Sequence, residues 1–209
     1  MKKMIAFMLS LVMLVSMTVM PAFAEENVAY RTLYSGEITS LNYLTTATTN
    51  EFTVAANIID TLVEHDAYGN IVPCLAESWD NTKDDGRTWT FTLRQGVQWV
   101  DHNGEVYAEL TAEDFVTAAK YILDAKNASS TANIFYSVID GAEAYYLGTS
   151  TPEEGAEPYP VMDFETVGVK ALDDYTLQYT LEKPTNYFPT MLSYGVFGPL
   201  CRSYYESMG

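Results

Sequence analysis

The sequence predicts an α/β protein with mixed sheets and flanking helices, and three segments carry that prediction. Residues 88–93 read T-W-T-F-T-L, so large apolar side chains alternate with threonines, as in a strand with one buried face. Residues 111–123 begin with T-A-E-D and then repeat apolar side chains at helical spacing. Residues 167–181 contain two alternating arms around Asp173 and Asp174, which predicts a hairpin.

The first 24 residues have the pattern of a secretory signal peptide. Lys2 and Lys3 precede an apolar run over residues 4–19, and Ala22 and Ala24 occupy the two positions that a signal peptidase reads. The run is slightly short for a span of about 20 residues, and a membrane anchor is the alternative. No cysteine stands at the processing site, so a lipobox is not predicted. We expect a protein secreted across the cytoplasmic membrane, either periplasmic or associated with the cell surface.

The chain is strongly acidic. It has 28 acidic and 11 basic residues, a formal net charge of −17. Removal of the signal peptide with Lys2 and Lys3 makes the charge −19. Such a surface argues against nucleic-acid binding, because phosphate contacts need lysine and arginine. Solubility outside the cell is a sufficient explanation for the charge.

The segment before residue 88 is predicted to contain a strand, a loop, a helix and a turn. Aromatic and β-branched residues over 28–34 favour a strand, and residues 37–42 follow as an extended loop. A helix is predicted over 53–64, and Tyr-Gly-Asn within 66–70 indicates a turn. The apolar residues of the helix recur at positions i, i+3, i+4 and i+7: Ala55, Ile58, Ile59 and Leu62.

The remaining elements follow from turn and breaker residues. Asp85-Gly86 predicts a tight turn before the strand at 88–93. A second helix is predicted between Ile134 and Tyr146, and the Pro-, Gly- and Glu-rich stretch 149–160 is predicted to be a surface loop. Pro184 ends the second arm of the later hairpin, and residues 187–209 are predicted to form a short helix and a loop.

No motif indicates catalysis, a cofactor or a metal ion, so we expect a protein that is not an enzyme. Residues 193–195 lack the leading Gly-x of a nucleophile elbow. His65 and His102 have no partners at metal-ligand spacing. Cys74 and Cys201 are far apart in the sequence, and both a disulfide and two free thiols remain open.

Five blocks together resemble one family, the extracytoplasmic solute-binding proteins of family 5, which serve oligopeptide and dipeptide ABC importers. They are, in order, Ser35–Asn42, Ile71–Trp79, Asp85–Trp99, Thr111–Val116 and Val167–Thr176. The first block has Asn42-Tyr43 where the family usually has Asp-Pro, and residues 101–110 are longer than the family's usual turn. Most matching residues are interpreted as structural, including three tryptophans expected to anchor the core: Trp79, Trp89 and Trp99.

The resemblance implies a periplasmic-binding-protein-like two-lobe fold of the class II type. Residues 1–24 would be the signal peptide and 25–50 the first segment of lobe I. Residues 51–166 would form an inserted smaller α/β subdomain, and 167–209 would return into lobe I. Because members of the family are much longer, the fold is expected to be truncated.

The resemblance also implies a function and a site. The protein would bind peptides in a cleft between the lobes and deliver them to the permease subunits of an ABC importer. Glu37, Ile38 and Thr39 would lie in a loop at this cleft and pair with the peptide main chain as with an added strand; an ordinary polar loop is the alternative. The rival functions are binding of a nickel chelate, haem or an oligosaccharide on the same fold, or a secreted enzyme or adhesive surface domain.

Overall fold

The computed structural model describes Leu33, Gly36–Lys83 and Asp85–Gly209, and the fold is built by residues 36–209. The expected signal peptide, residues 1–24, lies outside the described residues. So does the strand predicted over 28–34, apart from Leu33.

The largest sheet joins two hairpins that are distant in the sequence. Its strands are β3 (Ala76–Asn81), β4 (Thr88–Leu93), β7 (Val169–Asp173) and β8 (Thr176–Thr180), in the order β3-β4-β8-β7. All neighbours are antiparallel, and β4 pairs with β8 at the centre of the sheet. The strand predicted over 88–93 and the later hairpin are therefore confirmed.

Two further hairpins lie outside this sheet. Strands β1 (Val63–His65) and β2 (Ile71–Pro73) form one, and β5 (Gln98–Val100) and β6 (Val106–Glu109) form the other. The turn predicted over 66–70 joins β1 to β2. There the Asp66 carboxylate accepts the backbone N–H groups of Tyr68 and Asn70 at 2.8 and 2.9 Å.

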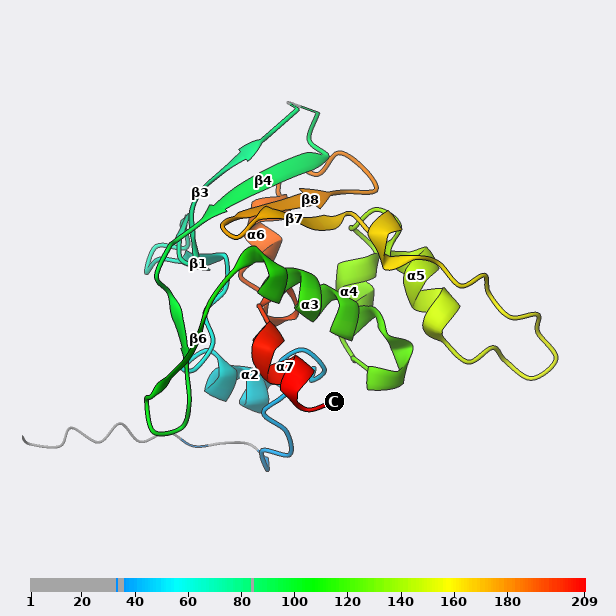
Figure 1. Cartoon of the computed structure of the whole chain (residues 1–209), viewed down its shortest axis with the longest axis horizontal. Helices are drawn as coiled ribbons and strands as arrows, with labels where there is room; N and C mark the ends of the chain where they lie inside the picture. The colour runs from blue at the N-terminus through cyan, green and yellow to red at the C-terminus, as the bar shows by residue number, and fades with distance from the viewer. Residues whose placement is uncertain (1–32, 34–35, 84) are drawn as a thin grey trace, which may run out of the picture. The chain divides into compact units, whose positions relative to one another are not determined.

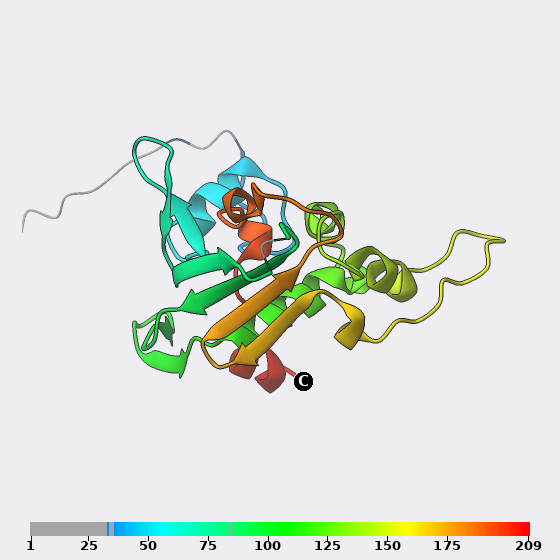
Figure 2. The same cartoon turned by 90° about the horizontal axis from the view of Figure 1, so that it is seen from above.

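Helices cover one side of the four-stranded sheet (Figures 1 and 2), and α3 packs against β7 and β8. The α-helices are α2 (Thr49–Ala55), α3 (Ala112–Leu123), α4 (Ala132–Tyr136), α5 (Ala142–Thr149), α6 (Phe188–Met191) and α7 (Arg202–Ser207). The 3-10 helices are η1 (Ala125–Asn127), η2 (Phe164–Thr166) and η3 (Gly195–Phe197). The segment 187–209 thus holds three short helices where one was predicted. Within the described part of the chain, no helix is long and apolar enough to cross a membrane.

The core lies between the sheet and the helices. The inward-facing residues of β4 are Trp89, Phe91 and Leu93, all buried. The Phe91 ring lies 6.0 Å from that of Tyr179 and 6.5 Å from that of Phe188, both at steep angles. Aromatic pairs prefer such edge-to-face geometry. Trp89 belongs to this core, while Trp79 and Trp99 pack against it, which confirms the predicted role of the three tryptophans.

A buried carboxylate fixes the start of α3. Thr111 is the N-cap residue, and its N–H donates to Asp114 Oδ2 at 2.9 Å. The same oxygen accepts from Trp99 Nε1 at 3.0 Å, and Asp114 Oδ1 accepts from the N–H of Arg202 at 2.7 Å. Asp114 therefore ties β5 and α7 to the first turn of α3, where a negative charge is favourable.

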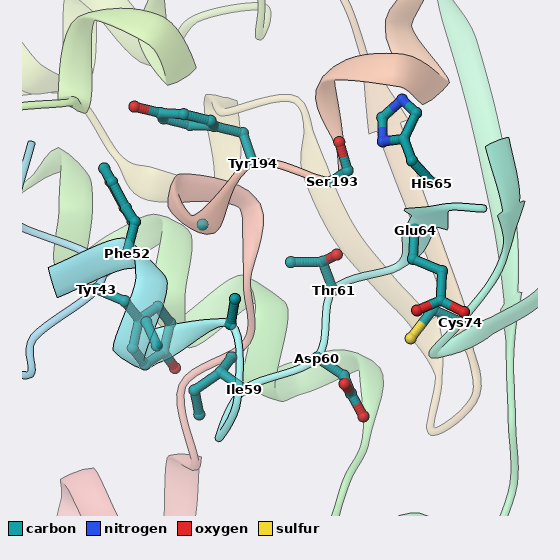
Figure 3. A pocket seen from close by; sticks show the side chains of 13 residues that line it. Tyr43, Phe52, Ile59, Asp60, Thr61, Glu64, His65, Cys74, Ser193 and Tyr194 are labelled. Carbon is teal, nitrogen blue, oxygen red and sulfur yellow. The ribbon is translucent and has the colours of Figure 1, made fainter. Parts of the chain in front are cut away.

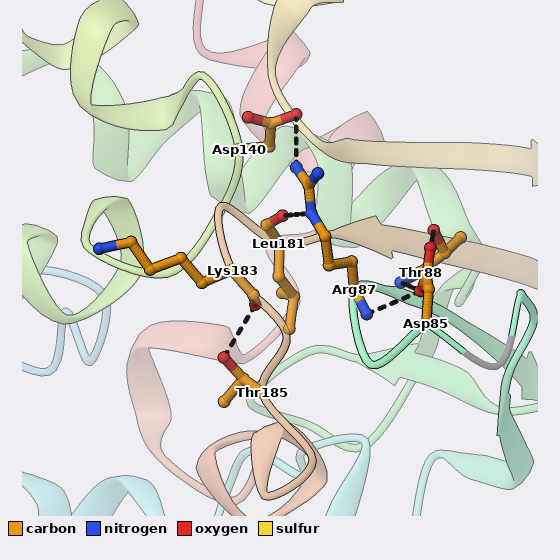
Figure 4. A network of polar contacts seen from close by, with 7 residues as sticks. All are labelled: Asp85, Arg87, Thr88, Asp140, Leu181, Lys183 and Thr185. Carbon is orange, nitrogen blue, oxygen red and sulfur yellow. Dashed lines mark hydrogen bonds and ion pairs between the residues drawn. The ribbon is translucent and has the colours of Figure 1, made fainter.

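Arg87 connects the two central strands with the turn after α4 (Figure 4). Its N–H donates to Asp85 Oδ1 at 2.8 Å, and its Nε donates to the carbonyl oxygen of Leu181 at 2.8 Å. Its guanidinium lies 3.7 Å from a carboxylate oxygen of Asp140. Gly86 has φ +68°, which is the conformation that the predicted tight turn requires.

The helix predicted over 53–64 is wrong. Helix α2 spans Thr49–Ala55, and Ile58 is 59% exposed. Leu62 is buried beside β1, where its carbonyl oxygen accepts the N–H groups of Cys74 and Ala76 at 3.2 and 2.9 Å. Pairing with a distant segment thus overrides the helical spacing of the apolar residues.

The single helix predicted between Ile134 and Tyr146 is also wrong, because α4 and α5 are separate. Ile139, between them, forms an isolated antiparallel bridge with Leu181. Gly141 has φ +70°, and a Cβ atom there would lie 2.6 Å from the carbonyl oxygen of Thr166. Both features interrupt helical hydrogen bonding, and the first depends on a strand far away in the sequence.

The core crosses the boundary expected between residues 166 and 167. Strand β4 lies before that boundary and pairs with β8 after it, and residues 35–209 form one compact unit. The assignment of 25–50, 51–166 and 167–209 to two lobes stays a prediction.

Candidate functional site

The loop that contains Glu37, Ile38 and Thr39 has no helix or strand, as predicted, and leads toward α2. Glu37 and Thr39 are exposed and Ile38 is half-buried. The structure places all three residues in one continuous segment. Their role in ligand binding stays a prediction.

The carboxylate of Glu51, on α2, holds this loop in place. Its Oε1 accepts from the N–H of Thr39 at 2.9 Å, the hydroxyl of Thr39 at 2.7 Å and the N–H of Ser40 at 2.9 Å. Its Oε2 accepts from the hydroxyl of Thr46. Glu51 is only 3% exposed. Nothing in the local sequence pattern separates Glu51 from the other 27 acidic residues, so it was not predicted as a site residue.

These bonds determine which main-chain groups of the loop remain available. The N–H groups of Thr39 and Ser40 already donate to Glu51. The peptide N–H and C=O groups of Glu37 and Ile38, in contrast, make no hydrogen bond within the described residues. Of the three predicted residues, Glu37 and Ile38 therefore keep main-chain donors and acceptors that a ligand could use.

The same hydrogen bonds alter the titration of Glu51. Donation from the Thr46 hydroxyl, and then from the hydroxyl and N–H of Thr39, lowers the Glu51 pKa from its usual 4.5 to about 2. The folded protein therefore keeps this carboxylate ionised well into the acid range. Because the folded pKa lies below the unfolded one, the linked stability is complete above about pH 4.5 and is lost as the pH falls toward 2.

We expect Glu51→Gln to flatten the acid side of the stability profile. The amide does not titrate, so the variant lacks the pH-dependent contribution of this carboxylate between pH 4.5 and 2. Urea unfolding of parent and variant at a series of pH values from 7 to 2.5 measures the difference. Stability profiles that stay parallel below pH 4.5 would contradict the assigned pKa.

A pocket of about 390 Å³ lies beside α2 (Figure 3). This volume falls in the usual range of small-ligand sites. Phe52 and Tyr194 lie on one side of it, with ring centroids 5.2 Å apart, while Glu64, His65 and Cys74 lie on the opposite side. The pocket is lined by Tyr43, Phe52, Ala55, Ala56, Ile59, Asp60, Thr61, Glu64, His65, Cys74, Ser193, Tyr194 and Gly195.

The side chains of this pocket do not form a catalytic arrangement. Burial and the nearby charges of Asp60 and Glu64 raise the pKa of the Cys74 thiol, which disfavours the nucleophilic thiolate. No hydrogen bond joins Ser193 to His65 in the described part of the chain. Cys74 and Cys201 are both free thiols. The pocket combines an apolar wall with the carboxylates of Asp60 and Glu64.

A second hollow of about 520 Å³ lies between α3, η2 and α7. Three of its charged groups pair with one another: Arg202 lies 2.7 Å from a carboxylate oxygen of Glu206 and 3.8 Å from one of Glu113. Residues 36–83 and 85–209, with Leu33, contain no group of three or more His, Cys, Asp or Glu side chains that could hold a metal ion.

The sequence matches a known family. The model of the bacterial extracellular solute-binding proteins, family 5 (middle), matches residues 70–200. The oligopeptide-binding protein AmiA of Streptococcus pneumoniae is 40% identical over 181 residues, which are 87% of this chain and 25% of AmiA. The chain therefore spans about a quarter of the length of the curated relatives it matches.

Solved structures agree with this match. An oligopeptide-binding protein of Borrelia burgdorferi superposes with a TM-score of 0.67 at 31% identity, over 81% of this chain and 31% of that one. Listeria monocytogenes OppA bound to peptide gives a TM-score of 0.68 at 26% identity, over 84% of this chain and 31% of that one. The predicted class II two-lobe fold, of which this chain holds a part, is therefore confirmed.

Proposed function

We propose that this chain, which belongs to family 5 of the bacterial extracellular solute-binding proteins, contributes to peptide binding by the extracytoplasmic component of an ABC importer. The component would pass its peptide to permease subunits in the membrane and would carry out no chemistry itself. Similarity to oligopeptide-binding proteins supports the ligand class. Residues 1–24 would direct export, with cleavage after Ala24.

The observation that carries this proposal is the main chain of Glu37 and Ile38, which makes no hydrogen bond within the part of the chain that the structure describes. In an extended segment, alternate residues direct their N–H and C=O groups to the same side, so Ile38, whose main-chain groups make no hydrogen bond within the described residues, can pair with a peptide as with a neighbouring strand. Main-chain pairing gives affinity with little dependence on the ligand's side chains, as a general peptide carrier needs.

We expect Ile38→Pro to weaken peptide binding by about 1–3 kcal/mol, because proline removes the N–H and leaves a buried ligand carbonyl without its donor. Ile38→Ala is the matched control, since it shortens the same side chain and keeps the N–H. Calorimetric titration with a short peptide measures both variants and the parent, after thermal melts show that each is folded.

The two variants separate a backbone role from a side-chain role. A large loss of peptide affinity in Ile38→Pro together with a small loss in Ile38→Ala supports main-chain pairing at Ile38. Equal affinity of the parent and a folded Ile38→Pro variant would remove this loop from the site.

A further inference from the structure

Glu51 is a buried carboxylate that is stabilised without a cation. None of the ion pairs among the described residues involves it, although it is only 3% exposed. Burying a charge is costly unless hydrogen bonds compensate for the lost water. Here four donors do so, and three of them come from Thr39 and Ser40 in the loop.

A second set of contacts fixes the direction of this carboxylate. The hydroxyl of Thr46 donates to Glu51 Oε2 and accepts from the N–H of Thr48 at 3.0 Å. Thr48 is the N-cap residue of α2. The residues before α2 thus fix the orientation of the Glu51 carboxylate, and this carboxylate in turn fixes the loop at Thr39 and Ser40.

We propose that Glu51 is a positioning residue for peptide binding, an inference that rests on the proposed function. By engaging Thr39 and Ser40, it keeps the segment in one conformation and leaves the main chain of Ile38 as the pairing position. The ligand's strand would then be registered at Ile38 and would not extend to Thr39, whose N–H is already used.

The proposal predicts a kinetic signature. If Glu51 acts by pre-organising the loop, its loss lowers the fraction of molecules that can bind, and the apparent Kd rises by the inverse of that fraction. Loop motions are faster than peptide association. The association rate should therefore fall by about the same factor as the affinity, while the dissociation rate changes little.

The test compares Glu51→Ala and Glu51→Gln with the parent by stopped-flow and calorimetric binding of one short peptide. We expect Glu51→Ala to lower affinity about tenfold or more, since three loop donors lose their acceptor. Glu51→Gln should lose less, because its amide oxygen can still accept from Thr39 and Ser40. Hydrogen exchange of these two amides reports the state of the loop directly.

Asp101→Asn is the matched control. The Asp101 carboxylate shapes the β5–β6 turn in the same way, accepting the N–H groups of Asn103 and Glu105 at 2.8 and 2.9 Å. Its replacement should disturb that turn and leave peptide affinity unchanged. If Glu51→Ala does not fold, Thr39→Val takes its place, because it removes the hydroxyl donor and nearly preserves side-chain shape.

The possible outcomes are distinct. Faster amide exchange at Thr39 and Ser40, together with a lower association rate, supports the inference. Faster exchange with unchanged peptide binding overturns it, as does a loss that lies wholly in the dissociation rate. If the parent itself binds no peptide, the proposed function fails and the positioning role fails with it. If the parent binds peptide and the Glu51 variants bind it equally well, only the positioning role fails.

Discussion

Phe188→Ala is expected to lower the free energy of unfolding by about 3–5 kcal/mol, the usual cost of truncating a fully buried phenylalanine. Phe188 is 0% exposed. Its ring lies 5.4 Å from Tyr179 and 6.0 Å from Phe197, and it also faces Phe91. Its removal therefore opens a cavity where the sheet meets the C-terminal helices.

Urea denaturation followed by tryptophan fluorescence measures this loss. Tyr187→Ala is the control, because Tyr187 is 65% exposed and should change stability by no more than about 0.5 kcal/mol. Phe188→Leu should lie between the two, since it leaves a smaller cavity. A Phe188→Ala variant as stable as the control would mean that this ring does not join the sheet to the helices.

Asp114→Ala is expected to lower the free energy of unfolding by about 2–4 kcal/mol. Three donors lose their acceptor: the N–H groups of Thr111 and Arg202 and the indole of Trp99. Asp114 is 3% exposed, so water cannot readily replace the carboxylate. Leaving buried donors unsatisfied is the costly part of deleting a hydrogen-bonding partner.

The adjacent Glu113→Ala variant is the control for Asp114. Glu113 has the same charge in the same helical turn, but its ion pair with Arg202, at 3.8 Å, is exposed and contributes little. The stability of Asp114→Asn should lie between those of Asp114→Ala and Glu113→Ala, because one side-chain oxygen remains as an acceptor. Equal melting temperatures for Asp114→Ala and Glu113→Ala would show that the three-donor contact does not stabilise the fold.

Local sequence patterns predicted correctly those elements in which the apolar residues of the pattern are also the residues that the fold buries. The alternation through Trp89 and Phe91 predicted β4 correctly, because the apolar face of that strand is buried while Thr90 and Thr92 on the other face are half-buried and exposed, respectively. The apolar stripe of α3, including Phe115 and Ile122, is buried as predicted. In each case the periodicity of the side chains and the tertiary packing require the same structure.

The errors occur where a distant partner decides the structure. Leu62 fits a helical stripe by spacing, but the backbone near it pairs with residues 74–76. Ile139 bridges to Leu181, which no local pattern encodes. For the candidate site, the family resemblance identified the loop at Glu37–Thr39, yet it could not show that Glu51 occupies the Thr39 N–H.

The order β3-β4-β8-β7 has a consequence for how the chain reaches its native state. Thr90 and Gln178, on adjacent central strands, are 88 positions apart. During synthesis β4 can pair with β3 early, but its other edge stays open until the later hairpin has been made. Such long-range pairing slows folding, because the chain must close a large loop before the contact forms. A nascent chain with this topology stays unfolded for longer, which exposes a strand edge of β4 to aggregation until the later hairpin pairs with it.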